Sequence, residues 1–223
     1  MDIGNSLDFS EVSITLVGGA GIYKKDLITC LELAPKLIAA DGGAEELKKF
    51  DRIPDYILGD LDSLIDAQLW EKLGSKVIKL QEQNTTDFEK CLYSIKAETF
   101  LGLGFIGKRV DHFLAVCSTM IKYHHKRVIL IGSHDVIFHV PQRLRVKLRP
   151  NTRVSLFPMK KIVGLDCSGL KWPISGLTFD PIYRVGTSNM SIENYLDVSL
   201  SDNGMLMILP KNCLHEVVSA LSR

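Results

Sequence analysis

Short apolar segments that end in glycine or aspartate recur along the first 131 residues, and helix-type segments separate them. Strands and helices that alternate in this way predict a parallel β-sheet with helices on both faces. The expected strands are 12–17, 36–40, 56–58, 76–80, 99–103 and 126–131, and the expected helices are 24–33, 44–50, 65–73, 87–96 and one that ends at residue 123.

After His134 the pattern changes to short alternating or apolar segments that prolines and glycines interrupt. Regularly spaced short strands are typical of a β-sandwich. The expected strands are 136–139, 144–148, 153–157, 162–165, 192–200 and 206–209, before a short helix at 212–221. We therefore predict an α/β plus β chain, with a Rossmann-like domain at 1–136 and a β-sandwich at 137–223.

Composition excludes several classes of protein. The formal net charge of the 223 residues is +1, which gives no basis for binding nucleic acid or an anionic membrane. A membrane-spanning helix would need a run of about 18 apolar residues, which we do not find. The first residues are acidic and polar, unlike a secretory signal. The five cysteines are widely spaced without a CxxC pair, which favours a reduced compartment, the cytoplasm.

Two carboxylates, Asp60 and Asp62, follow the third expected strand in the segment GDLDS. In an extended segment, residues two positions apart point to the same side, so both carboxylates could share one cation. Mg²⁺ prefers oxygen ligands and usually needs one or two carboxylates plus substrate phosphates. The alternative is a polar turn in which Asp62 or Ser63 caps a helix.

Three further acids stand after expected strands or at the start of a helix: Asp41, Asp87 and Asp111. Ligands bind outside the carboxyl ends of the strands in such sheets, so these acids predict one acidic rim. Acids gathered there would repel each other unless cations neutralise them, which favours a Mg²⁺–nucleotide site.

Other polar groups lie beside these acids. Thr86 and Glu89 have the spacing of a capping box at the start of the helix that begins at Asp87. This pattern indicates either a well-capped helix only or a helix N-terminus that also binds a phosphate, with Lys90 one helical turn further along. Arg109 can hold phosphate bidentately. His112 has a core or capping role as its alternative to catalysis. The glycines 18–21 after the first strand suit either a phosphate or an ordinary turn.

Six segments occur in one order and spacing: ADGGA (40–44), GDLDS (59–63), QNTTDFEKCL (83–92), GxxGxRxDHxLA (104–115), GLKWP (169–173) and GTSN (186–189). Together they resemble the thiamine pyrophosphokinase family over nearly the whole chain after the first ten residues. The resemblance implies a homodimer that transfers the diphosphoryl group of ATP to thiamine and releases AMP. It also implies that the first domain is catalytic and that the second binds thiamine and dimerises.

The resemblance assigns roles residue by residue. It implies catalytic groups at Asp41, Asp60, Asp62, Asp87 and Arg109, with Mg²⁺ on Asp60, Asp62 and Asp87. It implies nucleotide contacts at Gln83, Thr86, Lys90, Arg109 and Asp111. The thiamine site would lie at the subunit interface, where Ser188 and Asn189 of one subunit face the acidic rim of the other. Asp41 and Asp87 are alternative acceptors of the hydroxyl proton, and a reaction without a dedicated base is the third alternative.

The chain departs from the family pattern at Glu45, Lys108, Met190 and Trp172, without losing a carboxylate. Trp172 is either a cation–π partner of the thiazolium or a core residue of the sandwich.

Two rival functions remain. One is another Mg²⁺-dependent nucleotidyl- or phosphotransferase, which would release diphosphate or ADP. The other is a regulator that binds Mg²⁺–ATP without consuming it.

Overall fold

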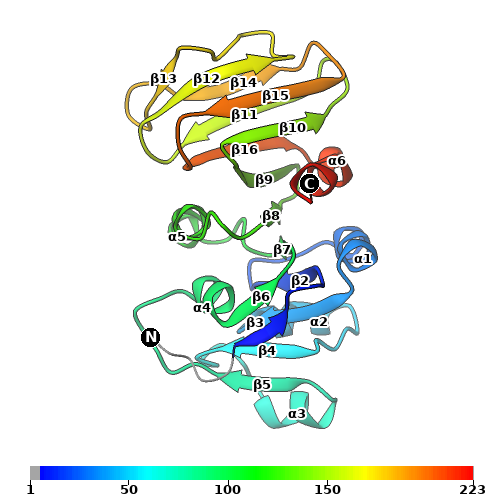
Figure 1. The fold of residues 1–223 in the computed structure, drawn as a ribbon. Coiled ribbons are helices and arrows are strands. Elements are labelled where there is room, and N and C mark those ends of the chain that lie inside the picture. Colours follow the sequence, from blue (N-terminus) through cyan, green and yellow to red (C-terminus); the bar gives the residue numbers. More distant parts are fainter. Residues whose placement is uncertain (1–5, 223) are drawn as a thin grey trace. The chain divides into compact units, whose positions relative to one another are not determined.

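The structure is a computed structural model, and it describes residues 6–222. By internal contacts the chain divides into two compact units, Met1–Thr119 and Met120–Arg223 (Figure 1). This division falls inside α5 (Val110–Lys122), whereas the sequence suggested a boundary after residue 136. The assignment of a function to each part stays a prediction.

The first unit contains a parallel sheet, as the alternation of strands and helices predicts. Its strand order is β7-β2-β3-β4-β5, and each neighbouring pair in it is parallel. The strands are β2 (Ile14–Val17), β3 (Lys36–Ala40), β4 (Tyr56–Gly59), β5 (Lys76–Lys79) and β7 (Phe100–Leu103). Every residue of β2 and β7 is buried, which explains their largely apolar sequences.

The strand order reverses beside β2, because β3, β4 and β5 lie on one side of it and β7 on the other. Ligands bind at such switch points, where neighbouring loops diverge. Here the loops after β2 and β7 touch at their bases, since the N–H of Ala20 donates to the carbonyl of Gly104 at 2.8 Å. Gly104 has φ +71, and a Cβ there would lie 2.2 Å from the carbonyl oxygen of Gly18. Only glycine therefore fits this close approach.

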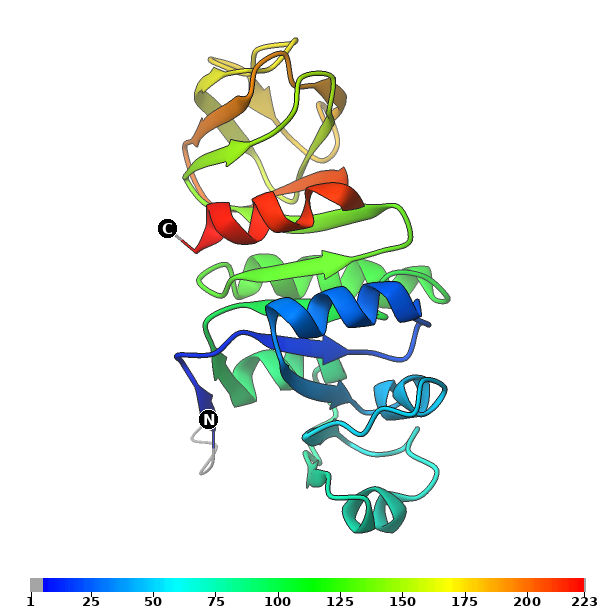
Figure 2. The same ribbon diagram turned by 90° about the vertical axis from the view of Figure 1, so that its right-hand side faces the viewer.

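Helices α1 (Lys24–Leu33) and α2 (Gly43–Lys48) lie on one side of this sheet and α4 (Asp87–Ser94) on the other (Figures 1 and 2). The side chain of Asp66 caps α3 (Ala67–Lys72). Helix α4 is shorter than predicted. After Ser94 the chain becomes extended and forms β6 (Ile95–Ala97), which pairs with β1 (Leu7–Phe9). This long-range pairing and the burial of Ile95 outweigh local helix propensity.

The second unit is built mainly of antiparallel strands in two sheets. One has the order β14-β11-β16-β9-β8, the other β10-β15-β12-β13. The strands are β8 (Val128–Ile131), β9 (Asp135–Val140), β10 (Arg143–Lys147), β11 (Arg153–Pro158), β12 (Ile162–Ser168), β13 (Thr178–Phe179), β14 (Gly186–Met190), β15 (Tyr195–Leu200) and β16 (Met205–Pro210). A short 3-10 turn, η1 (Lys211–Cys213), leads into the terminal helix α6 (Leu214–Leu221).

Three strands of this unit were not predicted correctly. The expected strand 192–200 begins only at Tyr195, and β13 and β14 have no counterparts among the expected strands. The sequence GTSNM of β14 has no alternation of apolar residues that would predict a strand. Its pairing with β11 relies on backbone hydrogen bonds and contains a register shift. Among residues 6–222, no helix combines the length and the apolar character needed to cross a bilayer.

Candidate functional site

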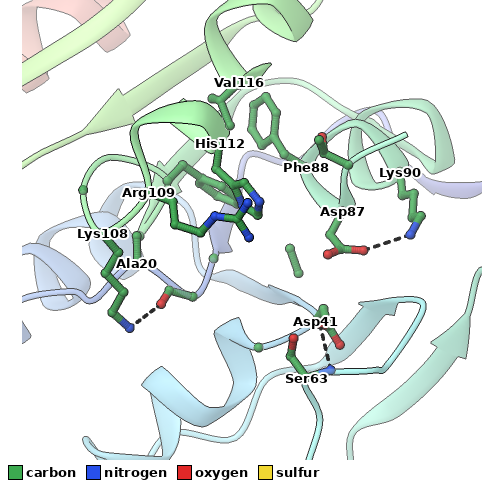
Figure 3. Close-up of a pocket in the computed structure, with 18 of the residues that line it drawn as sticks. Ala20, Asp41, Ser63, Asp87, Phe88, Lys90, Lys108, Arg109, His112 and Val116 are labelled. Carbon is green, nitrogen blue, oxygen red and sulfur yellow. Dashed lines mark hydrogen bonds and ion pairs between the residues drawn. The ribbon is translucent and has the colours of Figure 1, made fainter. Parts of the chain in front are cut away.

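A cavity of about 460 Å³ opens at the carboxyl ends of β2, β3, β4 and β7 and at the start of α4 (Figure 3). Its volume is within the usual range for a small-molecule site. Glycines 18, 19 and 42 form part of its wall, and the predicted residues that line it are Asp41, Asp60, Thr86, Asp87, Lys90 and Arg109. The structure therefore brings together acids that lie up to 46 residues apart, Asp41 and Asp87.

Three carboxylates converge in this cavity. Asp41, Asp60 and Asp87 each offer an oxygen, and the three oxygens lie within 4.8 Å of one another. Gly59 allows this convergence, since a Cβ there would lie 2.7 Å from Cβ of Asp41 and 3.2 Å from Oδ1 of Asp87. The glycine of the GDLDS segment is thus needed for space between two acids.

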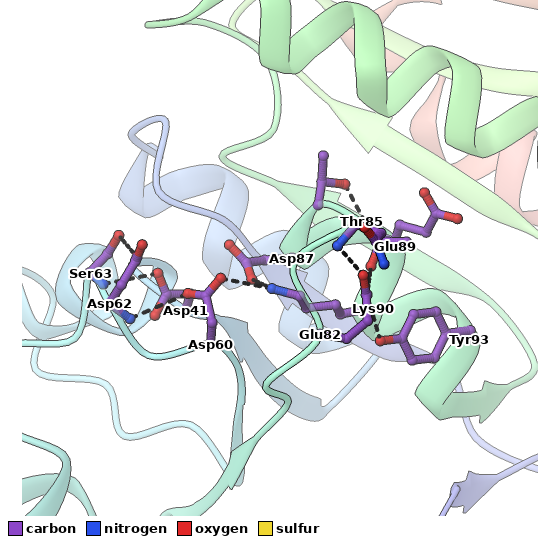
Figure 4. Close-up of polar contacts among 12 residues, drawn as sticks. Asp41, Asp60, Asp62, Ser63, Glu82, Thr85, Asp87, Glu89, Lys90 and Tyr93 are labelled. Atoms are coloured by element: carbon purple, nitrogen blue, oxygen red, sulfur yellow. Dashed lines mark hydrogen bonds and ion pairs between the residues drawn. The ribbon is translucent and has the colours of Figure 1, made fainter. Parts of the chain in front are cut away.

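Lys90 supplies a positive charge inside the cluster (Figure 4). Its side chain is 1% exposed, and its Nζ lies 2.8 Å from Asp60 Oδ2 and 3.1 Å from Asp87 Oδ1. Burial lowers the pKa of Lys90, but hydrogen bonds to the two carboxylates outweigh this and raise it overall. The hydrogen bond from Lys90 likewise lowers the pKa of Asp60. Lys90 therefore stays charged and favours the ionised form of Asp60.

Asp41 is the most buried acid of the cluster, at 2% exposed. Burial raises its pKa, as do the charges of Asp87 and Asp62, although hydrogen bonds from Ser63 oppose them. Its Oδ2 accepts the backbone N–H of Ser63 at 3.2 Å. Its Oδ1 is buried without a hydrogen-bond partner among residues 6–222. A buried oxygen of this kind needs an explanation, and a cation beside the three carboxylates would satisfy it.

Asp62 lies outside this close group. Its side chain accepts a hydrogen bond from Ser63 Oγ at 2.9 Å, and the residue is exposed. The expectation of an extended segment was wrong here, because β4 ends at Gly59 and Leu61 has φ +67. This left-handed residue breaks the alternation that would place Asp60 and Asp62 on one side. The role of Asp62 as a metal ligand stays a prediction.

The segment before α4 is held by a network that sequence reasoning missed. Thr86 caps α4 as predicted, with its Oγ1 accepting the N–H of Glu89 at 3.3 Å. Glu82 accepts hydrogen bonds from the hydroxyl of Thr85 and the N–H of Asn84 (Figure 4). No local pattern marks Glu82, since its partners follow it in an irregular loop. Gln83, a predicted nucleotide contact, is exposed and does not line the cavity.

Basic groups line the opposite wall of the cavity (Figure 3). Arg109 donates from Nε and Nη2 to the two oxygens of Asp111, at 3.2 and 2.6 Å. These hydrogen bonds lower the pKa of Asp111 to about 2. Lys108 also lines the cavity and donates to the carbonyl of Gly19. His112 lines it too, and it is exposed, so it is not a core residue.

Comparison with known proteins adds independent information. Residues 28–131 match the family model described as "Thiamin pyrophosphokinase, catalytic domain". Thiamine pyrophosphokinase 1 of Arabidopsis thaliana is 28% identical over 208 residues, and the alignment covers 78% of this chain and 78% of the relative. Thiamin pyrophosphokinase 1 of Caenorhabditis elegans is 27% identical over 201 residues, and the alignment covers 82% of both chains. The chain is therefore similar to thiamin pyrophosphokinases over most of its length. The solved thiamin pyrophosphokinase of Candida albicans shares its fold, with a TM-score of 0.77, 22% identity and 92% of each chain covered.

The segment GTSN (186–189) lies in β14 of the second unit. Ser188 has φ +61, and its N–H donates to Ser155 Oγ at 3.1 Å. Asn189 is 7% exposed; its Oδ1 accepts the N–H of Trp172 at 3.2 Å, and its Nδ2 donates to the carbonyl of Trp172 at 2.7 Å. Asn189 therefore fixes the backbone of Trp172. The core alternative for Trp172 was wrong, because its side chain is 54% exposed.

Proposed function

We propose that this chain transfers the diphosphoryl group of ATP to the hydroxyl of thiamine, giving thiamine diphosphate and AMP. The observation that carries the proposal is the convergence of three carboxylates and a buried lysine in a cavity at the switch point of a parallel sheet. The names of the family relatives describe the same activity.

Asp41, Asp60 and Asp87 fit a Mg²⁺ ion, since their oxygens already lie close together and Asp41 Oδ1 lacks a partner among the described residues. Held by these carboxylates, Mg²⁺ would supply positive charge to neutralise phosphate oxygens. Asp62 is proposed as a further ligand. Asp41 and Asp87 are both candidates for accepting the hydroxyl proton. The pH–rate profiles of Asp41→Asn and Asp87→Asn distinguish between them.

The basic wall suits the phosphates of ATP. Asp111 occupies Nε and Nη2 of Arg109, which fixes the plane of the guanidinium and leaves Nη1 for a phosphate oxygen. The N–H groups at the start of α4 favour negative charge in the same cavity. Transfer of this kind depends mainly on positioning and charge neutralisation, which these groups provide.

We further propose that the first unit is a Rossmann-like nucleotide-binding domain and that the second, a β-sandwich, binds thiamine and forms a homodimer in the cytoplasm. Ser188 and Asn189 of one subunit would face the acids of the other. The exposed indole of Trp172, held by Asn189, offers a surface for the thiazolium. Lys171 Nζ lies 4.7 Å from the centroid of this ring, so thiamine would compete with it.

One incubation tests the reaction. The purified chain is mixed with ATP, Mg²⁺ and thiamine, and the products are separated chromatographically. AMP and thiamine diphosphate in equal amounts support the proposal, whereas ADP, free diphosphate or unconsumed bound ATP would each identify a rival function. Asp60→Asn should be inactive. Asp8→Asn is the matched control, because Asp8 is an exposed acid whose Oδ2 lies 3.9 Å from Nζ of Lys96.

Subunit mixing tests the shared site. At thiamine concentrations well below KM, Asp60→Asn dimers would be inactive and Asn189→Ala dimers would keep about a tenth of the wild-type activity. Mixed dimers would contain one intact site. Random exchange should therefore restore about a quarter of the wild-type activity. If mixing restores nothing while exchange of subunits is verified, each site belongs to one subunit.

A further inference from the structure

The loop between β7 and α5 has a tether in its middle that the proposed mechanism does not use. Lys108 donates from Nζ to the carbonyl of Gly19 at 2.6 Å and to Glu46 Oε1 at 3.0 Å. The first partner is in the loop after β2 and the second in α2, 62 residues away in sequence. Figure 3 shows Lys108 reaching along the cavity wall towards the turn that carries Ala20.

The partner carboxylate is a firm anchor. The side chain of Glu46 is 8% exposed, and its other oxygen pairs with Lys49 at 2.8 Å. Burial raises the pKa of Glu46, but the hydrogen bonds from Lys49 and Lys108 outweigh it and lower the pKa overall. Both oxygens are thus satisfied by lysines, one of which comes from the loop.

The backbone of Lys108 indicates that these contacts hold the loop against its local preference. Lys108 has φ +44, in the left-handed region that residues with a side chain rarely adopt. Such a conformation persists only where the surroundings impose it. The neighbouring Gly107 also has positive φ, so the segment before Arg109 turns sharply.

We propose that Lys108 is a positioning residue: its bridge to Glu46 and Gly19 sets the loop that presents Arg109 to the phosphates of ATP. This inference rests on the proposed function. Arg109 directly follows Lys108 in the chain, and the N–H of Phe113 in α5 binds its carbonyl at 3.2 Å. The tether and α5 together therefore fix the backbone on both sides of the guanidinium.

A set of four variants tests this proposal: Lys108→Met, Glu46→Gln, the double variant, and Lys49→Met as control. Lys49→Met removes the other partner of Glu46 but leaves the loop tether. Lys108→Met and Glu46→Gln should each raise KM for ATP roughly tenfold and leave KM for thiamine unchanged, because small displacements of a positioning group are costly. The double variant should be no worse than either single variant.

The opposite result distinguishes a direct phosphate ligand. If Lys108 bound ATP itself, Glu46→Gln would free its ammonium, and KM for ATP would fall or stay the same. That outcome, or additive effects in the double variant, would overturn the proposal.

Hydrogen exchange gives a readout that does not depend on turnover. Peptides covering residues 104–109 should exchange faster in Lys108→Met and Glu46→Gln than in wild type or Lys49→Met. Unchanged exchange in Lys108→Met overturns the tether. If the wild type makes no thiamine diphosphate, the proposed function fails, and the exchange data together with equilibrium binding of Mg²⁺–ATP still decide for or against the tether.

Discussion

The ammonium of Lys90 lies 2.8 Å from the carboxylate of Asp60, and the lysine side chain is almost fully buried. A buried charge of this kind costs free energy unless a partner compensates it. Lys90 meets two partners, so it offsets part of the repulsion between Asp60 and Asp87. This pairing explains how an acidic cluster is stable within the fold.

Replacing Lys90 with methionine should therefore lower both stability and turnover. We expect the free energy of unfolding to fall by about 2 kcal/mol, because two carboxylates lose their cation but remain partly exposed. Turnover should fall about a hundredfold. Thermal unfolding with and without Mg²⁺ checks the first point, and added Mg²⁺ should recover part of the loss. Lys96→Met is the control: this exposed lysine lies 3.9 Å from Asp8, and its loss should change stability little. An unaffected Lys90→Met would contradict the electrostatic role.

Replacing Asp41 with asparagine should stabilise the fold and lower turnover. Because burial raises the pKa of Asp41 above its ordinary value of 3.8, the ionised side chain opposes folding. The variant should gain about 1 kcal/mol at pH 7 and lose activity, a common trade-off at functional sites. The gain should shrink as pH falls through the raised pKa and disappear below 3.8, where Asp41 is protonated in both folded and unfolded chains. Urea unfolding from pH 3 to 8 measures this difference.

Asp62→Asn is the matched comparison for Asp41→Asn. Asp62 is exposed, so its replacement should leave stability unchanged within about 0.5 kcal/mol. Turnover should nevertheless fall strongly if Asp62 binds Mg²⁺. Full activity of Asp62→Asn would remove this residue from the metal site and leave Asp41, Asp60 and Asp87 as the ligands.

The buried His139 in the second unit should make the free energy of unfolding depend on pH. Burial lowers its pKa from 6.5 to about 4, with smaller effects of His124 and Lys160, and its Nε2 accepts the N–H of Gly204 at 3.3 Å. The unfolded chain therefore binds a proton that the folded chain refuses between these values. Stability should rise with pH from about 4 to 6.5, by up to about 3 kcal/mol. His139→Gln should flatten this slope in urea titrations, whereas the exposed His215→Gln should not.

Asn189→Ala should act on thiamine through Trp172. Without the two hydrogen bonds from Asn189, the backbone of Trp172 is released, so KM for thiamine should rise about tenfold. Trp172→Ala should give a similar rise, and KM for ATP should be unchanged in both. Initial-rate kinetics with each substrate varied in turn measures this split. A rise in KM for ATP of the same size would show general damage instead.

Much of the fold follows from local patterns. The strands Lys36–Ala40 and Lys76–Lys79 and the helix Lys24–Leu33 agree with the expected segments to within a residue, because the patterns that predict them are local. The cap at Thr86 was predicted for the same reason. The sequence did not predict β14, because a polar strand held by backbone pairing shows no alternation of apolar and polar side chains.

The sequence by itself determined that acids would stand at the ends of parallel strands, because apolar runs, glycines and aspartates specify strands and turns locally. Only the tertiary structure decided which acids meet. The left-handed backbone at Leu61 separates Asp62 from the cluster, whereas Gly59 leaves room for Asp41 beside Asp87. Likewise, the burial of Lys90 and the bridge from Lys108 to Glu46 depend on distances between segments far apart in the chain. Such distances arise from packing and loop dihedral angles, which no local pattern encodes.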